Sequence, residues 1–115
     1  MNKNEKLYLE LKMYLWEKYG EENVMCKPKE AVFNHIYPDC LRRFRYDFYL
    51  IKENIGIEVN GGQFMSKNGG AGRHNRGGKG YEEDLTKLNI AQKHNTKVYQ
   101  FTYQMLSRLE YKDYI

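Results

Sequence analysis

The sequence contains little that is typical of a membrane, secreted or zinc-binding protein. No apolar stretch approaches the roughly 20 residues that a membrane-spanning helix requires. The opening residues, MNKNEK, lack the apolar core of a signal peptide. The two cysteines, Cys26 and Cys40, are too few for a disulfide scaffold and lack metal-site spacing. We therefore expect a protein with reduced thiols and no membrane partner, located in the cytoplasm, or in the host cytoplasm if a phage encodes it.

Acidic residues are missing from one long segment of the chain. None lies between residues 59 and 81, whereas four basic residues do: Lys67, Arg73, Arg76 and Lys79. These four charges equal the formal net charge of +4, so the rest of the chain is balanced. A local basic cluster is typical of proteins that bind a polyanion. A basic loop that is merely solvated is the alternative.

The same region is rich in glycine and poor in aliphatic residues. Residues 61–80 contain eight glycines. A segment of this length without a periodic apolar pattern predicts a mobile loop or lid, and such loops often carry function. The chain as a whole has 115 residues, of which 41% are hydrophobic and 15% aromatic. That composition excludes a disordered chain and predicts one folded domain over residues 1–115, with a modest core.

The spacing of apolar residues predicts a small α/β domain with a mixed sheet. Leu7, Leu11 and Leu15 follow helical spacing, and Gly20 stands where a helix of residues 5–19 would end. The clearest strand covers residues 42–51, where aromatic and polar residues alternate. The other expected elements are short β or irregular stretches at 24–25 and 31–33, turns at 37–39 and 52–54, a strand at 55–60, a helix at 81–94 on the pattern of Leu85, Leu88 and Ala91, a strand at 97–102 and a helical tail at 103–111.

Two carboxylates interrupt the hairpin formed by the strands at 42–51 and 55–60. A turn centred between Lys52 and Glu53 pairs Asp47 directly with Glu58, on the face opposite the apolar side chains of the hairpin, and a register slip of two would make them diagonal neighbours on that face. Like charges placed in this way repel each other, and a divalent cation would remove the repulsion because hard cations prefer converging carboxylate oxygens. Ion pairs with Arg43 and Arg45 are the alternative. The pattern therefore favours a metal site.

The residues around these acids resemble those of a known superfamily. The run RYDFYL at 45–50, followed by IEVNGG at 57–62, resembles the split acidic motif of PD-(D/E)XK nucleases. The segments at 72–77, 80–89 and 97–102 are also similar to small phage and bacterial members, akin to very-short-patch-repair-like endonucleases and Holliday junction resolvases. The resemblance covers about residues 42–102. It implies a restriction-endonuclease-like fold, in which a mixed sheet is flanked by helices.

The resemblance also assigns candidate roles. It implies that Asp47, Glu58 and the Val59 carbonyl bind Mg²⁺ or Mn²⁺. The usual lysine of the motif is replaced by Asn60, so a lysine from a neighbouring element is expected, with Lys87 and Lys79 as candidates. Gln63 is a candidate for positioning water, and Glu10 for a third acid, with plain surface exposure as its alternative. The expected contacts to the DNA backbone are Lys67, Arg73, His74, Arg76 and Lys79, with a role as a base as the alternative for His74.

Together these features predict a metal-dependent DNA endonuclease. Phosphodiester hydrolysis requires a cation that polarises the phosphoryl group and activates water, and positive charge that stabilises the transition state. The substrate is expected to be DNA, and a branched or four-way junction would suit a homodimer. Two alternatives remain open. One is a nucleic-acid-binding module of the same fold with weak or no catalysis. The other is a structural or protein-binding component of a phage or mobile element.

Overall fold

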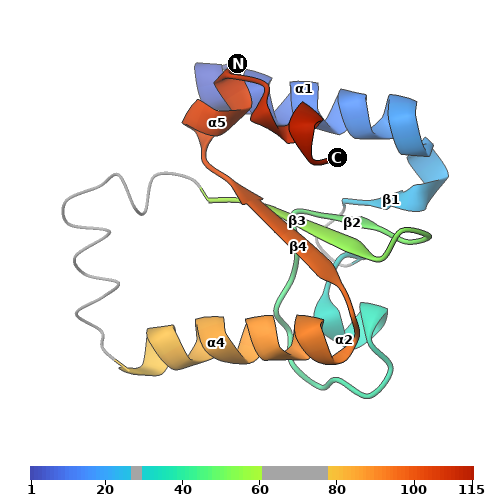
Figure 1. Ribbon diagram of the computed structural model, residues 1–115, viewed down its shortest axis with the longest axis vertical. Helices are drawn as coiled ribbons and strands as arrows, with labels where there is room; N and C mark the ends of the chain where they lie inside the picture. Colours follow the sequence, from blue (N-terminus) through green and yellow to red (C-terminus); the bar gives the residue numbers. More distant parts are fainter. Residues whose placement is uncertain (27–29, 61–77) are drawn as a thin grey trace.

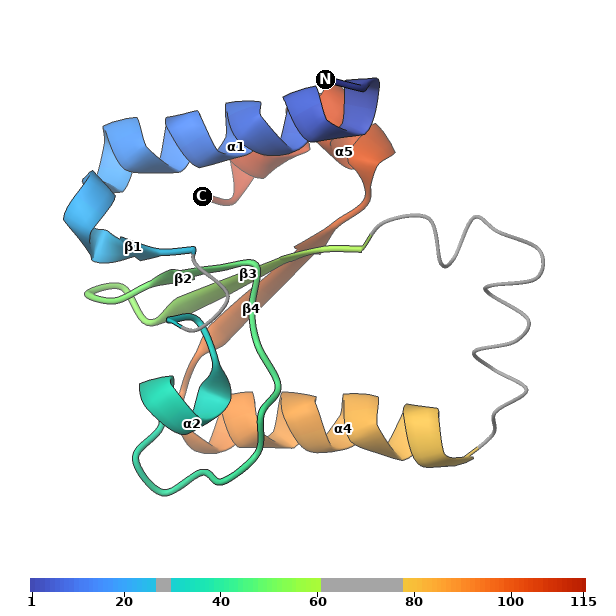
Figure 2. The ribbon, with the colours of Figure 1, turned by 180° about the vertical axis from the view of Figure 1, so that it is seen from behind.

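A four-stranded mixed sheet with helices on both faces forms the centre of the molecule (Figure 1). The computed structural model describes residues 1–26, 30–60 and 78–115. Helices α1 and α5 lie on one face of the sheet, and α4 and α2 lie on the other, as the view from behind also shows (Figure 2). The expected α/β class with a mixed sheet is confirmed. Among the described residues, no helix combines the length and apolar character needed to cross a membrane.

The first helix forms where the sequence predicts it. Helix α1 spans Lys3–Tyr19 and begins with a capping box, in which Asn2 and Glu5 each accept the other's backbone N–H. It ends at Gly20, whose φ of +91° is a conformation that suits glycine. Leu11 and Leu15 face the sheet and are fully buried. A short 3-10 helix, η1 (Glu21–Asn23), then leads into the sheet.

The strands of the sheet are β1 (Val24–Met25), β2 (Phe48–Leu50), β3 (Ile55–Val59) and β4 (Lys97–Phe101), in the order β1-β2-β3-β4. Strand β2 runs antiparallel to both β1 and β3, and β4 runs parallel to β3. The register within β2 and β3 is the predicted one, since Phe48 pairs with Ile57 and Leu50 with Ile55. The direct pair expected between Asp47 and Glu58 is not part of this ladder, because the Asp47 N–H donates to the Ile57 carbonyl. Asn54 closes the turn in the left-handed region, at φ +57°.

The predicted strand at 42–51 is wrong over residues 42–47, because β2 begins only at Phe48. Residues 41–44 are irregular, and Arg45 forms only an isolated bridge with Val32. The cause lies at Asp47, whose N–H donates to the Ile57 carbonyl (3.0 Å) although Phe48 is already the partner of Ile57. Two residues thus oppose one, as in a β-bulge. The four-residue helix α2 (Phe33–Ile36) replaces the end of the stretch expected at 31–33.

The sheet separates two hydrophobic cores. The first lies against α1, α5 (Tyr103–Ser107) and the 3-10 helix η3 (Glu110–Asp113), and includes Phe48, Leu50 and Ile57. The predicted helical tail is therefore two short helices. The second core lies on the α2 and α4 face and includes Tyr46 and Tyr49. Because residues 46 and 49 enter one core and residues 48 and 50 the other, β2 is buried on both faces.

Helix α4 spans Gly78–Lys93, so it begins three residues before the predicted start, and residues 78–80 of the loop expected at 61–80 are helical. The rest of that expected loop, 61–77, lies outside the described residues. The predicted apolar face of the helix is only partly correct. Ala91 is buried, but Leu85 and Leu88 are 42% and 44% exposed. The helix instead turns Lys87 towards the sheet. The physical reason is the ion pair that Lys87 forms there.

The ring of Tyr46 packs directly on the backbone of Gly56. A Cβ atom at position 56 would lie 2.5 Å from Tyr46 Cε1, which is closer than real Cβ contacts. The ring is held in place, because its hydroxyl lies 2.9 Å from the Tyr37 hydroxyl, which in turn lies 2.6 Å from Thr96 Oγ1. Gly56 is therefore required by the second core.

We expect the substitution Gly56→Ala to destabilise the protein by about 1–3 kcal/mol, because overpacking forces side chains or backbone to shift. Urea unfolding followed by circular dichroism measures the change. On a Tyr46→Ala background the same substitution should cost much less, because the clash is then gone. An equal cost on both backgrounds would show that the Tyr46 contact is not the cause.

The buried tyrosines predict a loss of stability at alkaline pH. Burial, followed by the hydrogen bond with Tyr37, raises the pKa of Tyr46, and burial raises the pKa of Tyr49, from an ordinary value of 10.0. Groups with a raised folded-state pKa contribute stability that is complete below the unfolded pKa and is lost as the pH rises above it. The free energy of unfolding should fall as the pH rises above about 10, and Tyr46→Phe should flatten this dependence. An unchanged dependence in Tyr46→Phe would contradict the assignment.

Candidate functional site

The side chain of Asp47 accepts a hydrogen bond from the β3 backbone just beyond the last backbone pair of β2 and β3. Its Oδ2 accepts the Val59 N–H (2.7 Å), and its Oδ1 accepts the hydroxyl of Tyr8 from α1 (3.3 Å). Burial raises the pKa of Tyr8, and the negative charge of Asp47 acts in the same direction. Tyr8 therefore remains a protonated donor, and both oxygens of the carboxylate are held. The sequence pattern does not indicate this role for Tyr8.

Glu58 carries the second carboxylate and pairs with Lys87. Lys87 Nζ lies 2.5 Å from Glu58 Oε1, and the two side chains are only 20% and 17% exposed. Lys87 also donates to the Arg45 carbonyl (2.9 Å), and its ammonium lies 5.9 Å and 5.8 Å from the ring centroids of Phe33 and Tyr46. The lysine is thus fixed by an anion, a carbonyl and two aromatic faces.

The structure therefore brings one of the two candidate lysines, Lys87, to Glu58. Lys79 lies in the first turn of α4, and its side chain is outside the described residues. Neither acid is joined to Arg43 or Arg45 by an ion pair within the described part of the chain. Glu58 has a lysine as its partner, and Asp47 has a hydroxyl and a backbone N–H.

Two other predicted site residues have different surroundings. The side chain of Asn60 donates to Gln100 Oε1 on β4 (2.7 Å). Glu10 is exposed. The pKa of Tyr111 is raised first by burial and then by the negative charge of Glu10. The pKa of Tyr103 is raised first by burial, then by the charge of Asp47 and then by that of Glu5.

The remaining candidates lie outside the described residues. They are Gln63, Lys67, Arg73, His74 and Arg76. Sequence reasoning missed two residues that interact with Asp47, Tyr8 through a hydrogen bond and Tyr103 through charge. Spacing offered little help in finding them, because a tyrosine on an amphipathic helix is usually a core residue.

The donors present at the acids fit a hard divalent cation. In an extended strand, the N–H and C=O of one residue point towards the same neighbouring strand. The hydrogen bond from the Val59 N–H to Asp47 therefore places this carboxylate on the side of β3 that also carries the Val59 carbonyl. Two carboxylates and a carbonyl are the oxygen ligands that Mg²⁺ and Mn²⁺ prefer. Within the described ranges, no group of three or more His, Cys, Asp or Glu side chains could hold a metal, so water would complete the shell.

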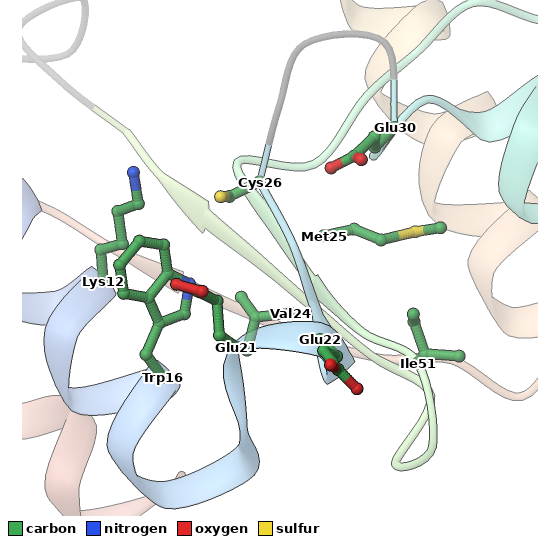
Figure 3. Close-up of a pocket in the computed structure, with 9 residues that line it drawn as sticks. All are labelled: Lys12, Trp16, Glu21, Glu22, Val24, Met25, Cys26, Glu30 and Ile51. Atoms are coloured by element: carbon green, nitrogen blue, oxygen red, sulfur yellow. The ribbon is translucent and has the colours of Figure 1, made fainter.

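A separate pocket lies beside the edge strand β1. It has a volume of about 430 Å³ and includes Trp16, Glu21, Met25 and Cys26 among the residues that line it (Figure 3). The indole Nε1–H of Trp16 is buried and has no hydrogen-bond partner within the described part of the chain. None of the residues that line this pocket is an acid or lysine of the candidate site.

Comparisons with models of protein families, with curated proteins and with solved structures give no match to this chain.

The Glu58–Lys87 pair should contribute to stability. Removing the ammonium with Lys87→Met leaves a largely buried carboxylate without its cation, which we expect to cost about 1–3 kcal/mol. Lys93→Met is the matched control on the same helix, because Lys93 pairs with Asp39 where both side chains are exposed, and it should change stability little. Urea unfolding of Lys87→Met, Glu58→Gln and the double variant measures the coupling. Strictly additive effects would show that the two side chains do not interact.

Proposed function

We propose that this protein is a metal-dependent nuclease that hydrolyses DNA phosphodiester bonds at Asp47, Glu58 and Lys87. The observation that carries the proposal is the position of Lys87, whose ammonium lies against the Glu58 carboxylate on the hairpin that also holds Asp47. In this proposal the two acids would supply metal ligands, and the lysine beside Glu58 would supply a positive charge. The restriction-endonuclease-like fold is part of this proposal, and the observed mixed sheet between two layers of helices is consistent with it.

Each residue has a defined task in this proposal. Asp47, Glu58 and the Val59 carbonyl would bind Mg²⁺ or Mn²⁺, which supplies the Lewis acidity that phosphodiester hydrolysis needs. Tyr8 and the Val59 N–H orient the Asp47 carboxylate. Lys87 would donate to a phosphoryl oxygen and stabilise the charge that develops there. Asn60 stays a proposed aid to water or phosphate, although its amide is engaged by Gln100.

The test compares the parent with Asp47→Asn and Glu58→Gln on linear and branched DNA in Mg²⁺ or Mn²⁺. We expect the parent to cut the DNA and a chelator to stop it. Each variant should cut DNA at least about 100-fold more slowly. Loss of a residue that only supports a metal ligand already costs up to about 100-fold, and these two acids are the proposed ligands themselves. Lys93→Met is the control that should retain the parental rate. Cleavage by both acid variants at the parental rate would overturn the proposal.

One observation favours a second candidate, a nucleic-acid-binding module without catalysis. Glu58 is already neutralised by Lys87, so this acid needs no metal to offset its charge. Titration of Mn²⁺ into the parent and into Asp47→Asn separates the two candidates. Binding to the parent that is lost in the variant favours the nuclease, whereas DNA binding without metal binding or cleavage favours the module.

A further inference from the structure

The segment between α2 and β2 carries three arginines whose charge is not compensated. Arg42, Arg43 and Arg45 are all exposed, and none pairs with an acid in the described part of the chain. The same segment holds two acids, and both are engaged elsewhere. Asp47 accepts from Tyr8 and from the Val59 N–H. Asp39 pairs with basic residues at the end of α4. Its Oδ1 lies 2.9 Å from His94 Nε2 and its Oδ2 lies 3.0 Å from Lys93 Nζ. The three arginines therefore form a positive surface.

The backbone that carries these arginines is held firmly. The Phe33 N–H donates to the Phe44 carbonyl (2.7 Å), and the Tyr46 N–H donates to the Ala31 carbonyl (2.9 Å). The guanidinium of Arg42 lies 4.6 Å from the centroid of the Phe44 ring, which packs edge-on against Phe33. Side chains that are placed in advance lose less entropy when they bind a partner.

The same segment adjoins the candidate site. The Arg45 carbonyl accepts the ammonium of Lys87 (2.9 Å), and Arg45 lies two residues before Asp47. The positive charge of Arg45 also acts on the hydroxyl of Tyr8. It lowers the pKa of Tyr8, whereas burial has the larger effect and raises it. The surface of the three arginines is therefore continuous with the groups that hold the two acids.

We infer that Arg42, Arg43 and Arg45 bind the phosphates of the DNA strand that flank the bond at Asp47 and Glu58, an inference that rests on the proposed function. Guanidinium groups match phosphate oxygens in a two-pronged geometry that lysine lacks. A polyanion is also the partner whose charge complements three exposed cations beside one another. This surface adds to the basic residues at 67–79 and is distinct from them in sequence.

The test measures DNA binding without metal ions over a range of salt concentrations, by fluorescence anisotropy of a labelled duplex. The variant Arg42→Ala/Arg43→Ala should weaken binding and lower the slope of log Kd against log salt by about two, about one for each lost phosphate contact. The control Lys52→Ala/Lys97→Ala removes the same charge from exposed positions in the β2–β3 turn and on β4. It should leave the slope close to that of the parent. Arg42→Lys/Arg43→Lys should keep the slope and still lose affinity.

A second measurement separates this inference from the proposed function. Hydrolysis of the small diester bis(p-nitrophenyl) phosphate in Mn²⁺ reports on the acids without flanking phosphates, so the arginine variant should hydrolyse it at the parental rate. A parent that hydrolyses neither this diester nor DNA would contradict the nuclease and leave the salt slope to decide on the arginines. An unchanged slope in the arginine variant, an equal loss in the lysine control, or no DNA binding by the parent at low salt would each overturn the inference.

Discussion

The structure depends on a change of face between Tyr46 and Phe48. Tyr46 enters the core beneath α4 and rests on Gly56, whereas Phe48 enters the core beneath α1. A regular strand would send both side chains to one face, so the backbone must be irregular at the residue between them. That residue is Asp47, and its carboxylate takes the Val59 N–H at the end of the ladder. The same irregularity builds both cores and positions one acid of the candidate site.

Helix α4 shows a conflict between local pattern and tertiary contact. It exposes Leu85 and Leu88 by more than 40% each, and it turns Lys87 inward. Burial of apolar area favours the opposite rotation, by roughly 25 cal/mol for each Å² removed from water. The ion pair with Glu58, the Arg45 carbonyl and the aromatic faces of Phe33 and Tyr46 outweigh this preference. Conflicts of this kind are expected where a protein gives up local consistency at a functional site.

Much of the fold was predictable because it rests on short-range patterns. The first helix, the hairpin register and the last strand follow from apolar spacing and turn residues, which act locally. The extent of β2 and the outward leucines of α4 were mispredicted, because cores on both faces of the sheet override alternation. Lys87 was predictable as one of two candidates but not as the partner of Glu58. Tyr8 was not predictable, because its hydrogen bond to Asp47 spans 39 residues and depends on how α1 crosses the sheet.

The balance of charge around the two acids decides what the site can bind. Asp47 and Glu58 alone would repel a phosphodiester, and Lys87 offsets only one of them. A phosphate can approach only if further positive charge surrounds the acids, whether from a metal or from side chains. The three exposed arginines before β2 supply such charge and have no acid of their own within the described residues. The ammonium beside Glu58 comes from Lys87 of helix α4 and not from position 60, where Asn60 follows the strand that carries Glu58.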